Sequence, residues 1–296
     1  MNGVTEPTGS RAADASLARR AWQRTSAIDA RYLIAFLITL VLVTAQLRYQ
    51  MVGGYSRLVL SLAVCTATEA LLSWFDRGKV VNLLSAYISG ISLTLLTKPQ
   101  GGAMWPFVLG GFLAISSKYV LRYRDNHLWN PTNFAICALL LLAPGHVSVL
   151  SHQFGNDITT NLVIWIFGLI IAARVGVLHI TLAYVACFLL LNALRAIVFG
   201  QLVLPEIAPI TGPMYQLFIF FMITDPRTVV RGRNRQIVVA IVIAVVESLI
   251  RLASDRGMLL PTAFNAAPAL LALAMVGPVA KWLDLRAGPR RPSLIA

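Results

Sequence analysis

The amino-acid sequence predicts an all-α integral membrane protein of about ten transmembrane helices, built as two inverted five-helix repeats with short or broken third and eighth spans. Of its 296 residues, 57% are hydrophobic and only 12% are charged, whereas soluble domains carry about 25% charged residues. Long uncharged apolar runs recur along most of the chain, and its two halves share short motifs in the same order. These three observations together define the predicted fold class.

The apolar runs define the predicted spans. A helix that crosses a bilayer needs about 20 predominantly apolar residues. The third candidate is interrupted by Gly90 and the eighth is short, so we expect these two to be incomplete. The ten candidate segments are 32–47, 58–75, 80–97, 104–121, 131–150, 160–175, 177–199, 213–224, 236–253 and 263–283.

The spans divide the chain into four parts. We expect a polar basic tail over residues 1–30, which ends in a short amphipathic helix (Leu17 to Arg24) on the inner membrane surface. The first five-helix repeat covers 31–152, the second covers 153–285, and a basic tail covers 286–296.

The three cysteines all fall inside spans, which predicts buried thiols without a disulfide framework. Histidines and cysteines form no metal-binding spacing, so no metal site is predicted.

The formal net charge is +13, and the distribution of the positive charges along the chain indicates how it is oriented in the membrane. If the N-terminus is cytoplasmic, 19 of the 25 Lys and Arg residues fall on the inner side and 6 toward the outer side. This bias follows the positive-inside rule. We therefore predict cytoplasmic N- and C-termini and contact with the lipid bilayer, and the charge does not indicate nucleic-acid binding.

An internal repeat supports the inverted arrangement. Thr97-Lys98-Pro99 recurs as Thr224-Asp225-Pro226 after 127 positions, and Pro131-Thr132 recurs as Pro261-Thr262 after 130. Five spans per half reverse the direction of the second copy, and working sites in such folds lie at the interface of the repeats near broken helices. A residue before proline is displaced from helical geometry, so Lys98 and Asp225 mark predicted chain breaks. The alternative is that both are ordinary helix ends at the membrane surface.

Four ionisable residues lie inside spans or near the end of one. Charges at membrane depth are costly and usually paired. By repeat offset and predicted depth, we expect two ion pairs, Glu69–Lys118 and Arg195–Glu247. We favour a structural role for these two ion pairs over a path for ions or protons.

The four histidines do not lie in pairs at matching membrane depth, as two ligands of one haem would. No nucleophile triad or nucleotide-binding loop is readable either, so the sequence predicts no catalytic residue.

Two motifs carry a resemblance to a known family. The first comprises Ser117-Lys118-Tyr119 and then His127-Leu128-Trp129-Asn130-Pro131-Thr132-Asn133-Phe134. The second is Phe220-Phe221-Met222-Ile223-Thr224-Asp225-Pro226. Over residues 30–285 the chain resembles the RnfD/NqrB family, whose members are membrane components of the Rnf electron-transport complex and of the sodium-pumping NADH:quinone oxidoreductase. It looks most like the stand-alone UnbU-like branch.

The resemblance implies a function in electron transport. Members of the family have a fold similar to urea channels and carry a flavin that moves electrons in complexes coupled to cation movement. The resemblance therefore implies a bacterial cytoplasmic (inner) membrane protein that works with other redox subunits or a soluble electron donor. No NAD(P)H motif is readable here, so the electrons have to come from another chain.

The resemblance also implies cofactor-binding residues. In the family, FMN is attached to the Thr of a Ser-Gly-Ala-Thr motif, just before the second segment above. This chain lacks that motif: Tyr215 stands at the attachment position and Thr211 is the nearest threonine. The expected cofactor is therefore FMN or riboflavin held non-covalently. Its phosphate would lie near the start of the helix at Asn130, because helix N-termini bind anions, and its ring would contact aromatic residues of the two motifs. The candidate residues are Lys118, Arg122, Asn130, Pro131, Asn133, Thr211, Tyr215, Thr224 and Asp225, with Phe220, Phe221 and Trp129 at the ring.

Two other functions stay open at this point. A fold does not determine a function, so the chain could be a small-solute channel or transporter of the same architecture. It could also be a membrane scaffold without a cofactor, serving a biosynthetic assembly.

Overall fold

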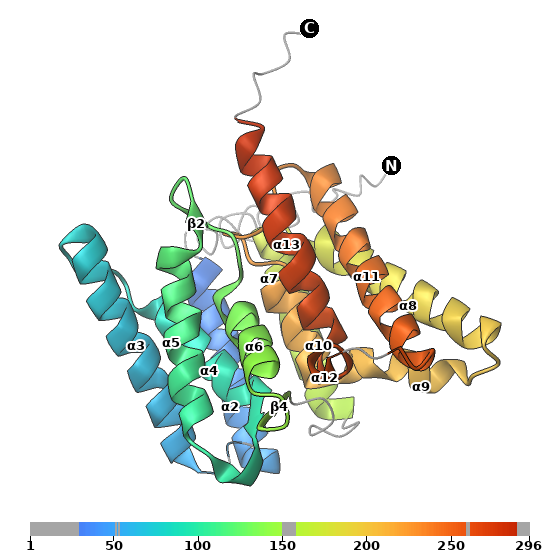
Figure 1. Cartoon of the computed structure of the whole chain (residues 1–296), viewed down its shortest axis with the longest axis horizontal. Coiled ribbons are helices and arrows are strands. Elements are labelled where there is room, and N and C mark those ends of the chain that lie inside the picture. Colours follow the sequence, from blue (N-terminus) through green and yellow to red (C-terminus); the bar gives the residue numbers. More distant parts are fainter. Residues whose placement is uncertain (1–29, 51, 53, 150–157, 259–260, 289–296) are drawn as a thin grey trace, which may run out of the picture.

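The computed structural model describes residues 30–50, 52, 54–149, 158–258 and 261–288. The described chain is helical almost throughout, with only two short two-stranded sheets (Figure 1). The predicted amphipathic helix from Leu17 to Arg24 lies outside the described residues, as does most of the C-terminal tail.

The described residues of the first half form five helices, with two short antiparallel strand pairs in the connections between them. Strand β1 (Thr97–Pro99) pairs antiparallel with β4 (Val147–Val149), and β2 (Arg122–Tyr123) pairs with β3 (Asn126–His127). A 3-10 turn, η1, covers Gln100–Gly102. The helices are α2 (Ala30–Tyr49), α3 (Tyr55–Arg77), α4 (Leu84–Leu96), α5 (Trp105–Val120) and α6 (Pro131–Leu142).

The second half contains long helices interleaved with short ones. Its third segment is a composite, because α10 continues into a π-helix, η3. The elements are α7 (Ile158–Val175), α8 (Leu178–Val198), α9 (Val203–Ile207), η2 (Ala208–Thr211), α10 (Pro213–Leu217), η3 (Phe218–Met222), α11 (Arg233–Asp255), α12 (Thr262–Ala266) and α13 (Pro268–Arg286).

Four of the described helices are long and apolar enough to cross a membrane: α3, α8, α11 and α13. Four shorter apolar helical stretches accompany them, at Tyr32–Leu47, Leu84–Leu96, Pro131–Leu142 and Asn161–Val175. Large apolar side chains such as Leu47, Phe75 and Leu202 are exposed on the outer faces, as suits a surface in contact with lipid. The chain is thus an all-α membrane protein.

The fifth predicted span, 131–150, is shorter than expected. Helix α6 ends at Leu142, and Val147–Val149 forms strand β4 instead of continuing the helix. The cause is local: Pro144 cannot continue a helical hydrogen-bond ladder, and Gly145 has a positive φ of 82°. A turn therefore replaces the last part of the predicted span.

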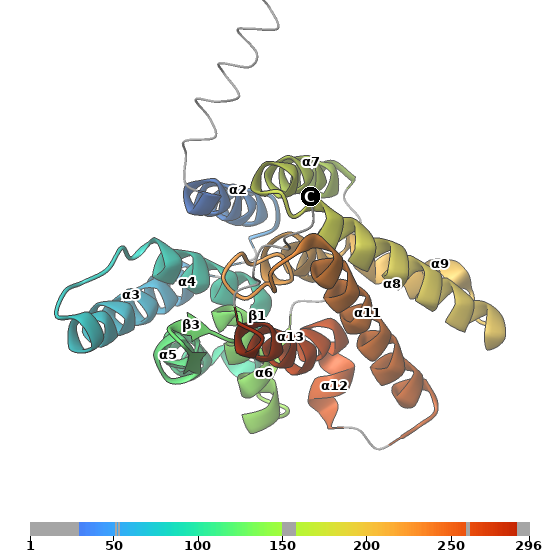
Figure 2. The ribbon, with the colours of Figure 1, turned by 90° about the horizontal axis from the view of Figure 1, so that it is seen from above.

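The helices form two groups that meet along a shared core. In the first group α3 packs on α4 and α5, and in the second α8 packs on α11. Contacts of α2 with α7 and of α6 with α13 join the groups, and Figure 2 shows both pairs side by side. The large hydrophobic cluster includes Leu37, Leu93, Ile136, Phe218 and Leu270, so a single core runs through both halves.

Both predicted chain breaks are confirmed. Helix α4 ends at Leu96, directly before the extended Thr97–Pro99 segment. The π-helix ends at Met222, and non-helical chain follows as far as Arg233. Thr97 and Thr224 are both buried, whereas the chain is exposed again at Gln100 and Pro226.

One of the two predicted intramembrane ion pairs is confirmed. Lys118 Nζ lies 2.7 Å from Glu69 Oε2, and both side chains are buried. Tyr119 Oη donates to Glu69 Oε1 over 2.8 Å, and Lys118 also donates to Ser85 Oγ over 3.0 Å. The carboxylate therefore has two donors, as a buried charge requires.

The predicted Arg195–Glu247 pair is wrong. Arg195 instead pairs with Glu206 and Asp255. Glu247 accepts hydrogen bonds from Arg251 and from the hydroxyls of two buried tyrosines, Tyr184 and Tyr215. Both residues have a nearer partner than each other. Arg251 lies one helical turn after Glu247 on α11, and the short helix α9 brings Glu206 beside Arg195.

The Glu69–Lys118 pair gives a direct test of the packing of α3 against α5. Removing one partner of a buried ion pair costs about 3–5 kcal/mol, so Lys118→Met is expected to lower the thermal unfolding midpoint in detergent strongly. The exchanged double variant Glu69→Lys/Lys118→Glu should recover at least half of that loss. Asp76→Asn serves as the control, because Asp76 pairs with Arg122 at the surface and its loss should change the midpoint little. A double variant no more stable than the worse single variant contradicts the pairing.

Candidate functional site

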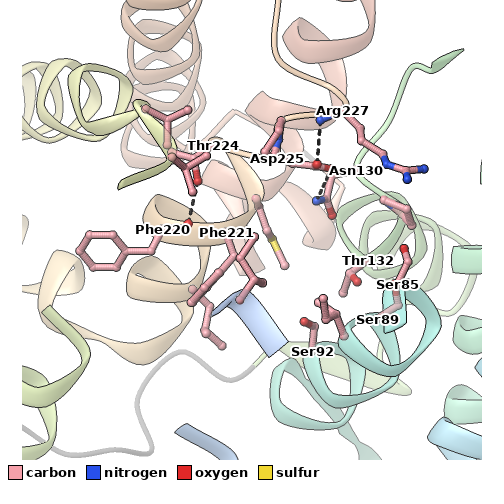
Figure 3. Close-up of a pocket in the computed structure, with 18 of the residues that line it drawn as sticks. Ser85, Ser89, Ser92, Asn130, Thr132, Phe220, Phe221, Thr224, Asp225 and Arg227 are labelled. Atoms are coloured by element: carbon pink, nitrogen blue, oxygen red, sulfur yellow. Dashed lines mark hydrogen bonds between the residues drawn. The ribbon is translucent and has the colours of Figure 1, made fainter. Parts of the chain in front are cut away.

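A cavity of about 330 Å³ lies where the two halves meet. Its walls come from α4, from the junction between β3 and α6, from α7, and from η3 with the turn that follows it. Figure 3 shows the polar side chains of the two halves arranged around it. This volume is at the lower end of the range of small-molecule sites, about 300–1,000 Å³.

Helix α4 forms a hydroxyl-bearing wall. Ser85, Ser89 and Ser92 follow at positions i, i+4 and i+7, which lie on one face of a helix, and all three line the cavity (Figure 3). Ser89 and Ser92 are 5% and 7% exposed, and their hydroxyls have no hydrogen-bond partner among the described residues. Thr132, at the start of α6, contributes a third such hydroxyl. Buried polar groups are normally paired, so these three are available to a bound molecule.

Asn130 connects the two halves at one end of the cavity. Its side-chain oxygen accepts from the backbone N–H of Asn133 over 3.1 Å, so it caps α6 as the sequence predicts. Its amide nitrogen donates to Asp225 Oδ2 over 3.1 Å, and Asp225 Oδ1 accepts from the backbone N–H of Arg227. Two motifs that are distant in sequence therefore meet at one hydrogen bond (Figure 3).

The π-helix supplies the aromatic wall. The N–H of Ile223 donates to the carbonyl of Phe218, five residues earlier, and such π-segments occur frequently at functional sites. Phe220 and Phe221 both line the cavity. The Phe220 ring packs edge-on against Trp165 of α7, at 5.1 Å between centroids. Gly168 permits this approach, because a Cβ atom there would lie 2.6 Å from the ring.

The charged and titratable residues at the cavity are His127, Asp225 and Arg227. Burial lowers the pKa of His127, and the nearby Asp225 carboxylate only partly opposes this shift. The imidazole is therefore neutral at pH 7. Arg227 is exposed, and its guanidinium makes no ion pair within the described part of the chain. It is thus the cation best placed to meet an anionic group at this end.

The structure brings six of the predicted cofactor-binding residues to the cavity: Asn130, Pro131, Thr224 and Asp225, with the aromatic residues Phe220 and Phe221. Thr224 uses its hydroxyl to bond the carbonyl of Phe220 over 2.7 Å. Lys118 does not line the cavity but reaches it through its hydrogen bond to Ser85.

Three other predicted residues of the first half lie elsewhere. Asn133 donates its amide to the carbonyl of Leu270 and holds α6 against α13. Arg122 is engaged at the surface by Asp76. Trp129 donates its indole N–H to the carbonyl of Ala274 and does not line the cavity.

Thr211 and Tyr215 do not line the cavity. Thr211 precedes α10 and Tyr215 lies on α10, two residues before Leu217, where this segment begins to line the cavity. Tyr215 is buried, and its hydroxyl is bonded to Glu247 and Arg251. Thr211 donates its hydroxyl to the carbonyl of Ala208.

The sequence analysis did not assign Ser85, Ser89, Ser92, Thr132 or Arg227 to a site. The serine spacing was a readable signal, because three hydroxyls on one face of an otherwise apolar helix are unusual for a lipid-facing surface. Within the described ranges, His, Cys, Asp and Glu form no group of three or more that could hold a metal ion.

Comparison with known proteins adds no assignment. No protein-family model matches the chain, and no curated protein matches its sequence. The class of the protein therefore rests on its fold, an all-α membrane protein with a cavity between its two halves.

The Asn130–Asp225 hydrogen bond can be tested separately from the helix cap. Aspartate caps helices as well as asparagine, so Asn130→Asp keeps the cap but places a carboxylate against Asp225. Hydrogen bonds to charged groups contribute about 1.5–3 kcal/mol, and we expect a loss of stability of that order, measured as the thermal unfolding midpoint. Asn130→Asp/Asp225→Asn should restore most of it. If Asn130→Asp is as stable as the natural chain, the contact does not join the two halves.

Proposed function

We propose that the chain is a membrane subunit of an electron-transfer system, similar to the RnfD/NqrB family, and that it holds a flavin non-covalently in the cavity between its halves. One observation carries this proposal. The two motifs on which the resemblance rests are about 90 residues apart in the sequence, yet they meet at Asn130 and Asp225 and line the same cavity.

The cavity walls fit a flavin chemically. An isoalloxazine ring is planar and apolar on its faces and has hydrogen-bonding groups along one edge. Phe220 and Phe221 offer aromatic contact, while the hydroxyls of Ser89, Ser92 and Thr132 are free to bond the polar edge. The ribityl chain or phosphate would lie toward Arg227. When bound, the flavin supplies the acceptance and release of electrons, and the protein supplies position and electrostatics.

Lys118 acts as a positioning residue in this proposal. It donates to the oxygen of Ser85 over 3.0 Å, so the Ser85 hydroxyl hydrogen is left to donate into the cavity. Ser85 would then bond an acceptor of the ligand, such as a ring carbonyl. Glu69 neutralises the ammonium group, so the cavity gains a directed donor without a net charge.

The surroundings of Tyr215 and Thr211 favour non-covalent binding. Attachment at Tyr215 would require its buried hydroxyl to leave both Glu247 and Arg251. Thr211 is separated from the cavity by the α10–η3 segment. Both hydroxyls are thus already bonded to other groups of the protein, outside the cavity lining.

We also propose that ten helical segments are inserted as two inverted halves, with both termini on the cytoplasmic side of a bacterial inner membrane. The order of elements supports this arrangement: α2 to α6 recur as α7 to α13, with a broken third segment in each half. Arg227 lines the cavity, and three more basic residues, Arg231, Arg233 and Arg235, follow it closely in the chain. An electron donor, either another redox subunit or a soluble protein, would approach from this face.

A flavin spectrum tests the proposed function. The protein is purified in mild detergent, and its absorbance and fluorescence are recorded before and after acid precipitation. We expect flavin to be released into the supernatant. Each serine hydroxyl contributes about 0.5–1.5 kcal/mol, so Ser89→Ala and Ser92→Ala should each weaken flavin binding by about 2- to 10-fold.

Tyr215→Phe and Thr211→Ala are the matched controls, and both should keep flavin in the supernatant fraction. Flavin that stays in the pellet and disappears with either control variant contradicts non-covalent binding. A folded protein that neither contains nor takes up flavin contradicts the proposed function itself, and solute flux in liposomes would then support a channel.

A further inference from the structure

A second, larger hollow lies in the second half; it shares no lining residue with the proposed flavin cavity, although its Trp165 packs against Phe220 of that cavity. We call it the α7–α9 groove; its volume is about 710 Å³, and α7, α8, α9 and η2 form its walls. Its lining is almost entirely hydrocarbon, including Leu162, Trp165, Leu189, Leu204, Ile207 and Ile210. Its only polar lining residues within the described chain are Asn161 and Thr211.

The groove opens onto a surface suited to lipid. Leu162 and Leu204 line it and are 55% and 73% exposed. Leu190 and Leu194, on the outer face of the neighbouring helix α8, are also exposed. Because α8 is long and apolar enough to cross a bilayer, the medium that meets this surface is the hydrocarbon of the membrane.

Water does not suit the interior of the groove. A bound water needs two to four polar partners, and hydrocarbon side chains provide none. No charged residue lines the groove in the part of the chain that the structure describes. A flavin phosphate would therefore have no counter-charge here, whereas an apolar chain would be surrounded by matching side chains.

The polar residues lie at one end. Asn161 is in the first turn of α7, and Trp165 follows one turn deeper on the same helix. Behind Asn161 and Thr211 lies Gln216, which is completely buried. Its amide nitrogen donates to Asn161 Oδ1 and to the carbonyl of Thr211, while its own carbonyl oxygen has no partner. Gln216 does not itself line the groove, so the polar groups that a bound molecule meets at this end are those of Asn161 and Thr211.

We propose that the α7–α9 groove binds one acyl chain of a bilayer phospholipid, with the donor groups of its headgroup at the Asn161–Thr211 end. The apolar lining holds the chain, the start of α7 places the polar end toward the membrane surface, and the two polar lining residues, Asn161 and Thr211, lie at that end beside the headgroup. This proposal is independent of flavin binding.

Fluorescence quenching by a brominated phospholipid tests the proposal. The full-length protein is delipidated in detergent and titrated with phosphatidylglycerol brominated in its acyl chains. The difference between the natural chain and Trp165→Phe isolates the emission of Trp165. We expect saturable quenching at one lipid per chain, and native mass spectrometry should find one phospholipid retained before delipidation.

Ala208→Phe is the test variant, because Ala208 lines the groove and a phenyl ring fills it. Ala186→Phe is its matched control, since Ala186 is exposed on α8 and does not line the groove. The first should weaken lipid binding at least about tenfold, and the second should leave it unchanged. If Ala208→Phe lowers the unfolding midpoint, the smaller Ala208→Leu repeats the test.

Quenching that rises without saturation, or that is equal in the Ala208 and Ala186 variants, overturns the proposal. Retention of a different molecule in native mass spectrometry, such as an isoprenoid, overturns the choice of a phospholipid.

Discussion

The constraint on which this structure depends is that backbone polar groups at a chain break need partners where no water is present. The chain breaks after Leu96 and again after Met222. The first break is satisfied within its own half, because β1 pairs with β4 and Gln100 donates to the carbonyl of His146. At the second break the Asp225 carboxylate accepts from the backbone N–H of Arg227, and its other oxygen accepts from the Asn130 side chain of the other half. That difference joins the π-helix end to the start of α6 and encloses the cavity between them.

Two networks of buried charged residues, one beside the cavity and one away from it, have different roles. Glu69 and Lys118 neutralise each other behind α4, and the remaining contact of Lys118 goes to Ser85 in the cavity wall. Glu247, by contrast, is enclosed by two tyrosines and Arg251, with no contact to the cavity. The first network directs a donor toward a ligand, and the second holds α8, α10 and α11 together. The cavity is consequently lined by hydroxyls and aromatic rings, a combination that favours a planar ligand with a polar edge.

Sequence reasoning succeeded where local chemistry decides the outcome. The Asn130 cap, the breaks before Pro99 and Pro226 and the Glu69–Lys118 pair all follow from residue type and position. The Arg195–Glu247 prediction failed because depth in a span does not give the direction of a side chain around its helix. Helix α9, which carries Glu206, has only five residues and is too short to be predicted from an apolar run. Motif alignment placed Tyr215 at the attachment position, but Tyr215 does not line the cavity and its hydroxyl is bonded to Glu247 and Arg251. The serine face of α4 was readable, yet only the fold shows that it faces a cavity.

The central claim is that the two motifs form one ligand cavity that opens on the cytoplasmic face. Thiol labelling of Ser89→Cys tests it most directly, in a chain whose three natural cysteines are replaced by alanine and which is reconstituted in vesicles of defined orientation. A membrane-impermeant maleimide should react only when it reaches the face that carries Arg227, and added flavin should slow the reaction. Labelling from the opposite face, or a rate that flavin leaves unchanged, would contradict the account.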